Sequence, residues 1–330
     1  MARPRPRPMR SAHKKPATAD NRNTTARVQR TSQESLAAFA PAKVNLTLRV
    51  LRRRVDGYHE IESLVAFADL GDDVTLNPGK ALAFSISGPT AAAAGPTRDN
   101  LILKAAQAFA SRLPEARLGR FHLVKRLPAA AGLGGGSADA AAALRLLARA
   151  NHLPPGDPRL LTAAAATGAD VPVCLDPRPR VMRGIGEILS EPVSLPQLPA
   201  VLVNPGVPVP TRDVFAALSS ASPLPQHTSA IPPASRESQL LPLLEWLSQA
   251  ANDLEPAAIA LQPVIADALA ALRGLADCRL ARMSGSGATC FGLFESADAA
   301  AVAVRQLEAK HSGWWVRTAM LGGQSGMILS

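Results

Sequence analysis

A run of glycines followed by a serine is the part of this sequence whose residue types and spacing point most directly to chemistry. Gly132, Gly134, Gly135 and Gly136 precede Ser137, and an alanine- and leucine-rich run with high helix propensity follows. A glycine-rich loop that opens a helix presents unpaired backbone N–H groups and the positive end of the helix dipole, an arrangement that suits phosphate. The sequence therefore predicts a phosphate-binding loop. The alternative is a flexible linker, although linkers are rarely followed at once by an apolar helix.

This loop differs from the two commoner phosphate loops. A Walker loop requires lysine and then serine or threonine after its last glycine, whereas Gly136 is followed by Ser137 and Ala138. A dinucleotide fingerprint requires a glycine three residues beyond the second glycine of Gly-x-Gly, and that position is Ser137. The pattern therefore indicates a third kind of loop.

Two charged residues are candidates for acid–base and phosphate chemistry. Lys43 and Asn45 lie two apart in a predicted strand over 42–50, so both project from one face. Asp170 follows a predicted helix over 159–167 and precedes an apolar segment that we expect to be extended. A carboxylate within reach of an alcohol can accept its proton, and a lysine can neutralise charge on a phosphate. The local alternative for Lys43 and Asn45 is an ordinary solvated strand face, and the local alternative for Asp170 is a simple cap or turn residue.

Tyr58 and His59 form a candidate platform for a planar ligand. They follow a predicted turn at Asp56 and Gly57, and Tyr58 is the only tyrosine of the chain. An aromatic face beside a hydrogen-bonding ring suits a base or a sugar. Packing at the edge of the core is the alternative for the tyrosine.

Composition limits the class of protein. The chain of 330 residues is 47% apolar, which is enough for one large domain or two ordinary ones. It has no uninterrupted apolar run of about 18 residues, so no membrane span is expected. Cys174, Cys278 and Cys290 are odd in number and lack metal-ligand spacing, so we expect buried, reduced thiols in a cytoplasmic protein.

Most of the net charge of +10 belongs to the first 35 residues. They hold nine lysines and arginines against two acidic residues, so the remainder of the chain is close to neutral. This tail has little apolar content and alternating Arg-Pro, which predicts disorder. Three interpretations of this tail remain open: a dispensable extension or wrongly chosen start, an arm that contacts nucleic acid, and a transit peptide.

Helical and strand patterns alternate irregularly, which predicts an α+β fold. We expect the tail over 1–35, a first domain that contains the glycine loop over 36–185, a second domain over 186–330 and an exposed loop over 221–235. The predicted strands are 42–50, 58–67, 74–76, 81–87, 121–127, 289–294 and 314–320, and the predicted helices are 100–113, 159–167 and 297–311, besides the one after the glycine loop.

Three segments resemble, in order, the signature motifs of the GHMP kinases, which phosphorylate small alcohols and acids with ATP. They are Pro-Ala-Lys-Val-Asn at 41–45, Pro128 with the glycine loop, and Arg-Met-Ser-Gly-Ser-Gly-Ala at 282–288. The resemblance implies the two-domain GHMP kinase fold with its active site in the inter-domain cleft. It also implies ATP with Mg²⁺, whose ligands no motif here fixes, and a phosphate site completed by Gly285 and Gly287.

Two further segments resemble the members of that family that act on a cytidine diphospho-sugar alcohol. Asp-Gly-Tyr-His-Glu at 56–60 implies that Tyr58 and His59 hold the cytosine, and Gly-Ala-Asp-Val-Pro-Val at 168–173 implies that Asp170 is the base beside Lys43. Other positions similar to the family are Asn100 and Lys125 at the nucleotide and Asn45, Thr211 and Phe215 at the substrate.

The activity implied is ATP-dependent phosphorylation of the 2-hydroxyl of that substrate, a step of the non-mevalonate isoprenoid route. The expected partner is this small molecule, with no membrane and no nucleic acid, and with a monomer or homodimer in the cytoplasm. The alternatives are a mevalonate- or homoserine-type kinase and a nucleic-acid-binding module acting through the tail.

The motifs depart from the family pattern at two places. Ala129–Ala131 are all alanine where the family often has glycines, which is expected to stiffen the loop, and Ser137 is followed by Ala138 instead of a second serine. The first 35 residues have no counterpart in the family.

Overall fold

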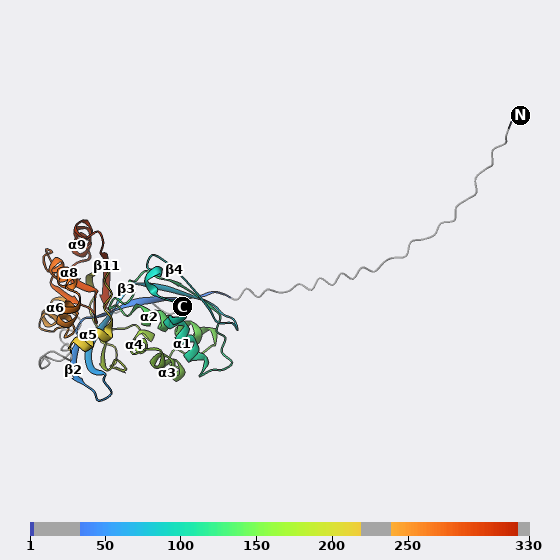
Figure 1. Ribbon diagram of the computed structural model, residues 1–330, viewed down its shortest axis with the longest axis horizontal. Helices are drawn as coiled ribbons and strands as arrows, with labels where there is room; N and C mark the ends of the chain where they lie inside the picture. The colour runs from blue at the N-terminus through green and yellow to red at the C-terminus, as the bar shows by residue number, and fades with distance from the viewer. Residues whose placement is uncertain (3–33, 219–238, 323–330) are drawn as a thin grey trace. The chain divides into compact units, whose positions relative to one another are not determined.

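The computed structural model of the chain describes residues 1–2, 34–218 and 239–322. The predicted tail and the predicted loop over 221–235 fall outside these residues, apart from 1–2, 34 and 35. The described residues from Glu34 onward form one compact unit (Figure 1). The predicted boundary at residue 185 therefore stays a prediction.

The described strands join in a single sheet. The order along the sheet is β4-β5-β3-β11-β8-β10-β9, while β1, β2 and β6 pair with other parts of β3, and β7 pairs with β6. The strands are β1 Leu36–Asn45, β2 Arg49–Arg53, β3 His59–Asn77, β4 Ala83–Ser87, β5 Arg120–Val124, β6 Arg180–Gly184, β7 Ile188–Leu189, β8 Leu198–Asn204, β9 Leu280–Met283, β10 Cys290–Leu293 and β11 Trp315–Gly322.

The helices pack against two different parts of this sheet. Helices α1–α4 gather around β1 and β3, and α8 and α9 pack on the strands from the second half of the chain (Figure 1). The helices are α1 Leu101–Ala110, α2 Gly135–Ala150, α3 Pro158–Thr167, α4 Val171–Leu175, α5 Thr211–Leu218, α6 Leu240–Ser248, α7 Glu255–Leu261, α8 Val264–Arg273 and α9 Ala297–Lys310, with short 3₁₀ turns at Ala91–Ala94 and Thr97–Asp99.

β3 is the strand on which the sheet depends. It is 19 residues long and pairs with β2 and β6 near its start, with β11 in its middle, with β5 at its end and with β1 along much of its length. The sequence predicted two strands here, over 58–67 and 74–76, whereas the structure has one continuous strand through Gly71. The glycine serves a close approach, since a Cβ at Gly71 would lie 2.3 Å from the Ala40 carbonyl oxygen.

β1 delivers the first motif into the interior. Its pairing with β3 shifts register between Pro41 and Lys43, and proline has no N–H to give to the ladder. Beyond the shift Lys43 lies opposite Phe67, and both Lys43 and Asn45 are almost fully buried. The strand therefore buries both of its faces, and the solvated face that was the local alternative does not occur.

α2 packs closely because it is built from alanines. Ala140, Ala141, Ala142 and Ala143 are each 0% exposed, and they share a core with β1, β3 and α1. Small side chains let the helix axis approach its neighbours, which fixes the position of the helix and of its N-terminus. The composition favoured this kind of core.

Several predicted elements match the structure, whereas the strand predicted over 42–50 is divided between β1 and β2, and the expectation that all three cysteines are buried is wrong. The helices predicted over 100–113, 159–167 and 297–311 correspond to α1, α3 and α9. Cys174 and Cys290 are buried free thiols, but Cys278 is only partly buried because it lies in the turn before β9. No described helix has the length and apolar character needed to cross a membrane.

Candidate active site

One cavity brings the predicted residues together from both halves of the chain. It has a volume of about 1120 Å³, and every predicted site residue except Gly287 lines it. Those on its wall are Lys43, Asn45, Tyr58, His59, Asn100, Lys125, Pro128, Gly132, Gly134, Gly135, Gly136, Ser137, Asp170, Thr211, Phe215 and Gly285. Gly287 instead donates its N–H to the Ser284 carbonyl from behind the wall.

The glycine loop ends at the start of a long helix, as predicted. Gly134 is the N-cap of the 16-residue α2 and has φ 61° and ψ 17°, in the left-handed region that glycine adopts without strain. A Cβ at this position would lie 3.1 Å from Cε of Lys43, so the missing side chain also makes room for the lysine. The first turn of α2 thus offers its N–H groups to the cavity beside an ammonium group.

The loop is bound to the third motif. The Ser284 hydroxyl donates to the Gly132 carbonyl at 2.9 Å, and the Thr289 N–H donates to the Ala131 carbonyl at 3.1 Å. A Cβ at Gly132 would lie 2.3 Å from the Ser284 carbonyl oxygen, so only glycine permits this approach. Segments about 150 residues apart in sequence therefore form one wall of the cavity.

Lys43 and Asp170 form the ion pair at the centre of the predicted chemistry. Nζ of Lys43 lies 2.9 Å from Oδ2 of Asp170, with the lysine side chain 5% exposed and the aspartate side chain 37% exposed. The ammonium group is thus held inside while the carboxylate reaches the cavity. This geometry leaves the carboxylate accessible to a bound alcohol.

The segment after Asp170 is the helix α4, so the expectation of an extended strand there is wrong. Val171 and Val173 favoured a strand, but Pro172 suits the first turn of a helix, and Asp170 takes the N-cap position. Burial, followed by the nearby Asp170 carboxylate, raises the pKa of the Cys174 thiol to about 12. The thiol therefore stays protonated and adds no charge next to the ion pair.

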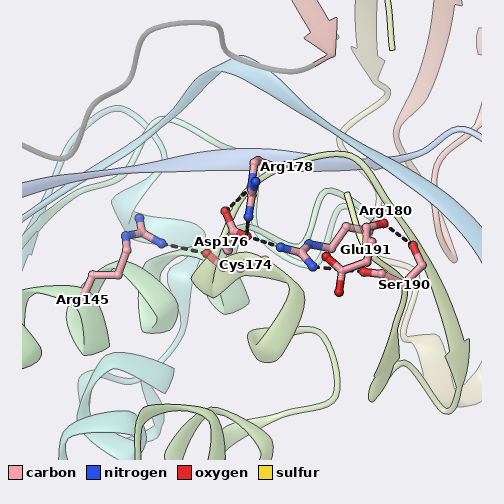
Figure 2. Close-up of polar contacts among 7 residues, drawn as sticks. All are labelled: Arg145, Cys174, Asp176, Arg178, Arg180, Ser190 and Glu191. Carbon is pink, nitrogen blue, oxygen red and sulfur yellow. Dashed lines mark hydrogen bonds and ion pairs between the residues drawn. The ribbon is translucent and has the colours of Figure 1, made fainter. Parts of the chain in front are cut away.

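An arginine cluster anchors the far end of α4 (Figure 2). The Arg145 guanidinium donates to the carbonyls of Cys174 and Phe39 at 2.7 Å each, which ties α2 to α4 and β1. Asp176 accepts from Arg178 and Arg180, which together lower the pKa of its carboxyl although burial acts in the opposite direction. Asp170 therefore begins a short helix that is fixed at its end.

Lys125 is held by two carboxylates that the sequence did not predict. Its Nζ donates to Oδ2 of Asp72 at 2.5 Å and to Oδ2 of Asp139 at 2.9 Å, and all three side chains are buried. The two carboxylates raise the pKa of Lys125 against the effect of burial. Burial raises the pKa of Asp139 to about 7, with the Asp72 charge adding to it and Lys125 opposing it.

The predicted platform lies at the other end of the cavity. The rings of His59 and Phe215 are stacked with centroids 5.0 Å apart and an interplanar angle of 23°, and Tyr58 is 60% exposed nearby in sequence. Burial, followed by the charge of Arg53, lowers the pKa of His59, so its ring is neutral at neutral pH. A neutral imidazole can exchange hydrogen bonds with a base edge.

The remaining predicted residues have structural partners as well as places on the wall. The Asn100 side chain accepts from the Ile102 N–H at 2.9 Å and so caps α1. Nδ2 of Asn45 donates to the Ser63 hydroxyl at 2.7 Å. The Thr211 and Ser286 hydroxyls lie 2.8 Å apart, which connects α5 to the third motif.

The sequence reasoning missed residues whose signal is weak on its own. Asp72 and Asp139 are acids within apolar surroundings, a pattern that marks buried polar partners, and Ser284 and Ser286 lie inside a motif that was interpreted through its glycines. Asn252 was missed because nothing in its neighbourhood resembles a functional motif. Its contacts are described below.

The fold and this cavity define a two-domain kinase that places a glycine loop opposite a lysine–aspartate pair. The model of the GHMP kinases N terminal domain matches residues 100–176, and that of the GHMP kinases C terminal matches residues 233–313. The chain belongs to the GHMP kinase family, and it is therefore an ATP-dependent kinase.

Two relatives within that family carry the same name. The 4-diphosphocytidyl-2-C-methyl-D-erythritol kinase of Xanthobacter autotrophicus is 56% identical over 292 residues, which cover 87% of this chain and 99% of the relative. The enzyme of that name from Methylobacterium radiotolerans is 57% identical over 287 residues, with coverage of 87% and 99%.

Solved structures agree with this relationship. A crystal structure of 4-(cytidine 5'-diphospho)-2C-methyl-D-erythritol kinase has a TM-score of 0.69 at 35% identity and covers 87% of this chain and 100% of its own. The homoserine kinase of Cytophaga hutchinsonii has a TM-score of 0.63 at 20% identity, with coverage of 88% and 95%, and shows the fold alone. The predicted α+β GHMP kinase fold is confirmed.

Proposed function

We propose that this protein transfers the γ-phosphate of ATP to the 2-hydroxyl of 4-diphosphocytidyl-2-C-methyl-D-erythritol, a step of the non-mevalonate isoprenoid route. The observation that carries the proposal is that one cavity contains the glycine loop, the Lys43–Asp170 pair and the His59–Phe215 stack. These three parts correspond to the phosphates, the reacting alcohol and the base of the two substrates. Relatives more than 50% identical over most of this chain carry that substrate in their name.

The residues present can assist each part of the transfer. The alcohol oxygen bonds to the γ-phosphorus as the bond to the bridging oxygen of ADP breaks, and Asp170 accepts the alcohol proton. Lys43 holds the Asp170 carboxylate in place at 2.9 Å, and its charge offsets the charge of the phosphates. The N–H groups at the start of α2 donate hydrogen bonds to the phosphate oxygens.

Mg²⁺ would bind mainly through the nucleotide. Among the described residues no group of three His, Cys, Asp or Glu side chains could hold a metal ion, and Mg²⁺ commonly keeps water and phosphate ligands with one or two protein oxygens. Asp170 and Ser137 supply hard oxygen donors on the cavity wall, so the site fits the ion. When bound, the ion neutralises phosphate charge.

The domain organisation and the location belong to the same proposal. We assign the ATP-binding domain to 36–185 and the second domain to 186–330, because the two family models match within these ranges. The three free cysteines support a reducing compartment, the cytoplasm.

ADP release by the purified protein with Mg-ATP tests the proposal. Acceptors to compare are the cytidine diphospho-sugar alcohol, mevalonate and homoserine. We expect turnover with the cytidine compound alone, because the rings of Tyr58, His59 and Phe215 on the cavity wall are suited to contact a planar base. Turnover with mevalonate or homoserine would retain the kinase and overturn the substrate.

A further inference from the structure

The loop between α6 and α7 touches the third motif from behind the cavity. It contains Asn252, whose side chain is 4% exposed and fully engaged. Its Nδ2 donates to the carbonyls of Met283 and Gly285 at 2.8 Å each, and its Oδ1 accepts from the Leu254 N–H at 3.0 Å. One amide group thus fixes two carbonyls of the motif that lie two residues apart, an arrangement that needs both N–H donors.

The carbonyls that Asn252 holds lie next to the atoms that support the glycine loop. Gly285 lines the cavity with φ 56°, and an added Cβ there would lie 3.1 Å from the Gly132 carbonyl oxygen. Between the two carbonyls, the Ser284 hydroxyl donates to Gly132. A path of direct contacts therefore runs from Asn252 through the 283–285 turn to the loop at the N-terminus of α2.

Neighbours of Asn252 join the same loop to the rest of the site. The Glu255 carboxylate accepts from the Met283 N–H at 3.0 Å, and the Asp253 carboxylate accepts from the Val50 N–H at 2.8 Å. The Arg282 guanidinium donates to the Leu46, Leu247 and Ala250 carbonyls. Of these contacts, only those of Asn252 reach the backbone of Gly285, a residue on the cavity wall.

We propose that Asn252 is a positioning residue for phosphoryl transfer, which sets the glycine loop against ATP by holding the Met283 and Gly285 carbonyls. It touches neither substrate. The expected effect on turnover rests on the proposed function. The expected effect of Asn252 on ATP binding does not depend on which alcohol is the acceptor.

Replacement of Asn252 by aspartate removes both N–H donors and keeps the shape of the side chain. In the variant Asn252→Asp a carboxylate oxygen faces two carbonyl oxygens, which forces the 283–285 turn away. Displacements of about 1 Å near reacting groups cost about 100-fold in rate, so we expect kcat/KM for ATP to fall at least about tenfold. KM for the cytidine acceptor is expected to change less than about threefold, since the platform lies on other elements.

Asn151 provides a matched control. Its Nδ2 donates to the Arg117 and Leu147 carbonyls at 2.9 and 2.8 Å, and its Oδ1 accepts from the Arg117 N–H, so it uses the same donors and acceptor. It lies at the C-terminal end of α2 and does not line the cavity. The variant Asn151→Asp should lower stability without changing kcat/KM for ATP.

Nucleotide affinity separates this inference from the choice of substrate. ATP binding is measured by calorimetry on the full chain without acceptor, for the wild type, the two aspartate variants and Asn252→Ala, which serves if Asn252→Asp does not fold. Weaker ATP binding in the Asn252 variants alone supports the inference even if the wild type fails to phosphorylate the cytidine compound. Unchanged ATP affinity and kcat/KM in folded Asn252 variants, or equal losses in the Asn151 variant, would overturn it.

Discussion

At the scale of single residues, the site contains a buried charge imbalance. Asp72 and Asp139 both bind Lys125, so three ionised side chains would leave one negative charge under the glycine loop. Oδ1 of Asp139 is buried and has no hydrogen-bond partner among the described residues. A proton on Asp139 removes the imbalance, which agrees with a carboxyl whose pKa burial raises to about 7.

The substitution Asp139→Asn tests this charge assignment. Because the folded pKa is raised above the ordinary value of 3.8, the folded state binds more protons, and this group costs stability as pH rises from about 4 to 7. Each pKa unit corresponds to about 1.4 kcal/mol, so the neutral amide should raise the unfolding free energy at pH 8 by more than about 1 kcal/mol. Denaturant unfolding at pH 5, where only part of this cost has accrued, should show a smaller gain than at pH 8. A loss of stability at both pH values would contradict the assignment.

Asp170→Asn removes the proposed base and keeps the size of the side chain. We expect kcat to fall by about 10²–10⁴-fold while ATP affinity changes little, because proton acceptance is lost and the phosphate contacts remain. Asp277→Asn is the control, since this exposed residue has φ 65°, a conformation that asparagine tolerates. Full activity of the Asp170 variant in the ADP-release assay would exclude it as the base.

Tyr58→Ala tests the platform. Base–aromatic stacking contributes about 1–3 kcal/mol, so KM for the cytidine acceptor should rise at least about fivefold. KM for ATP should stay the same, because the nucleotide residues lie on other elements. Initial rates over a grid of both substrates measure the two constants. Equal rises in both would argue against a role in holding the base.

The residues of the site were predictable where a motif contained them. Lys43, Asp170, His59 and Phe215 were chosen from short segments, and the structure brings them to one cavity. Asn252 could not be found that way, because its role depends on two backbone carbonyls about 30 residues away. Every residue has a backbone carbonyl, so the residue types of a segment do not indicate which of its carbonyls a distant side chain will bind.

At the scale of elements, the loop before α2 contains an unusual alanine. Ala130 has φ 48°, in the left-handed region where a side chain is strained. Compared with glycine, an alanine at this position limits the conformations of the unfolded loop at a cost in the folded one.

A pair of glycine substitutions measures that strain. Ala130→Gly should be more stable than Ala129→Gly by about 1–2 kcal/mol, because the left-handed penalty is relieved at Ala130 and no positive φ exists at Ala129. Both variants gain the same freedom in the unfolded chain. Thermal melts of the two, compared with the wild type, give the difference. Equal stabilities would mean that Ala130 is not strained.

α4 shows why local patterns fail for short elements. Its five residues are apolar and rich in valine, which favours a strand, and tertiary packing against α2 and α3 decides the outcome. The longer helices, α1, α3 and α9, were found because an apolar face repeats over several turns.

At the scale of the whole molecule, the compact unit begins at Glu34. Most of the positive charge precedes this point, so the charge of the kinase body is small. The reading of the tail as a nucleic-acid arm falls on residues 3–33, outside those described. The kinase and the tail can be tested separately.

Deletion of residues 1–33 should leave the melting temperature and the kinetic constants for both substrates unchanged, because the contacts of the compact unit start at Glu34. Any binding to DNA should be steeply salt-dependent and should be lost with the tail. Filter binding at several salt concentrations, together with ADP release, measures both. Loss of turnover in the shortened protein would show that the tail takes part in the reaction.

The class of fold was predictable, but the sheet was not. Composition and motif order indicated α+β halves with a cleft, whereas the pairing of β11 with β3 and β8 depends on contacts between distant segments. The local sequence pattern of residues 315–322 does not indicate which strands will lie on either side of them.

The position of β11 has a consequence for protein synthesis. This last described strand lies between β3 and β8, so a growing chain can complete neither edge until residues 315–322 have left the ribosome. Until then β3 and β8 each expose backbone donors and acceptors that another chain could join. A polypeptide whose synthesis stops before residue 315 would therefore contain Lys43 and Asp170 but would leave strand edges of β3 and β8 unpaired. Such a polypeptide is a candidate for aggregation and for degradation by the quality control of the cell.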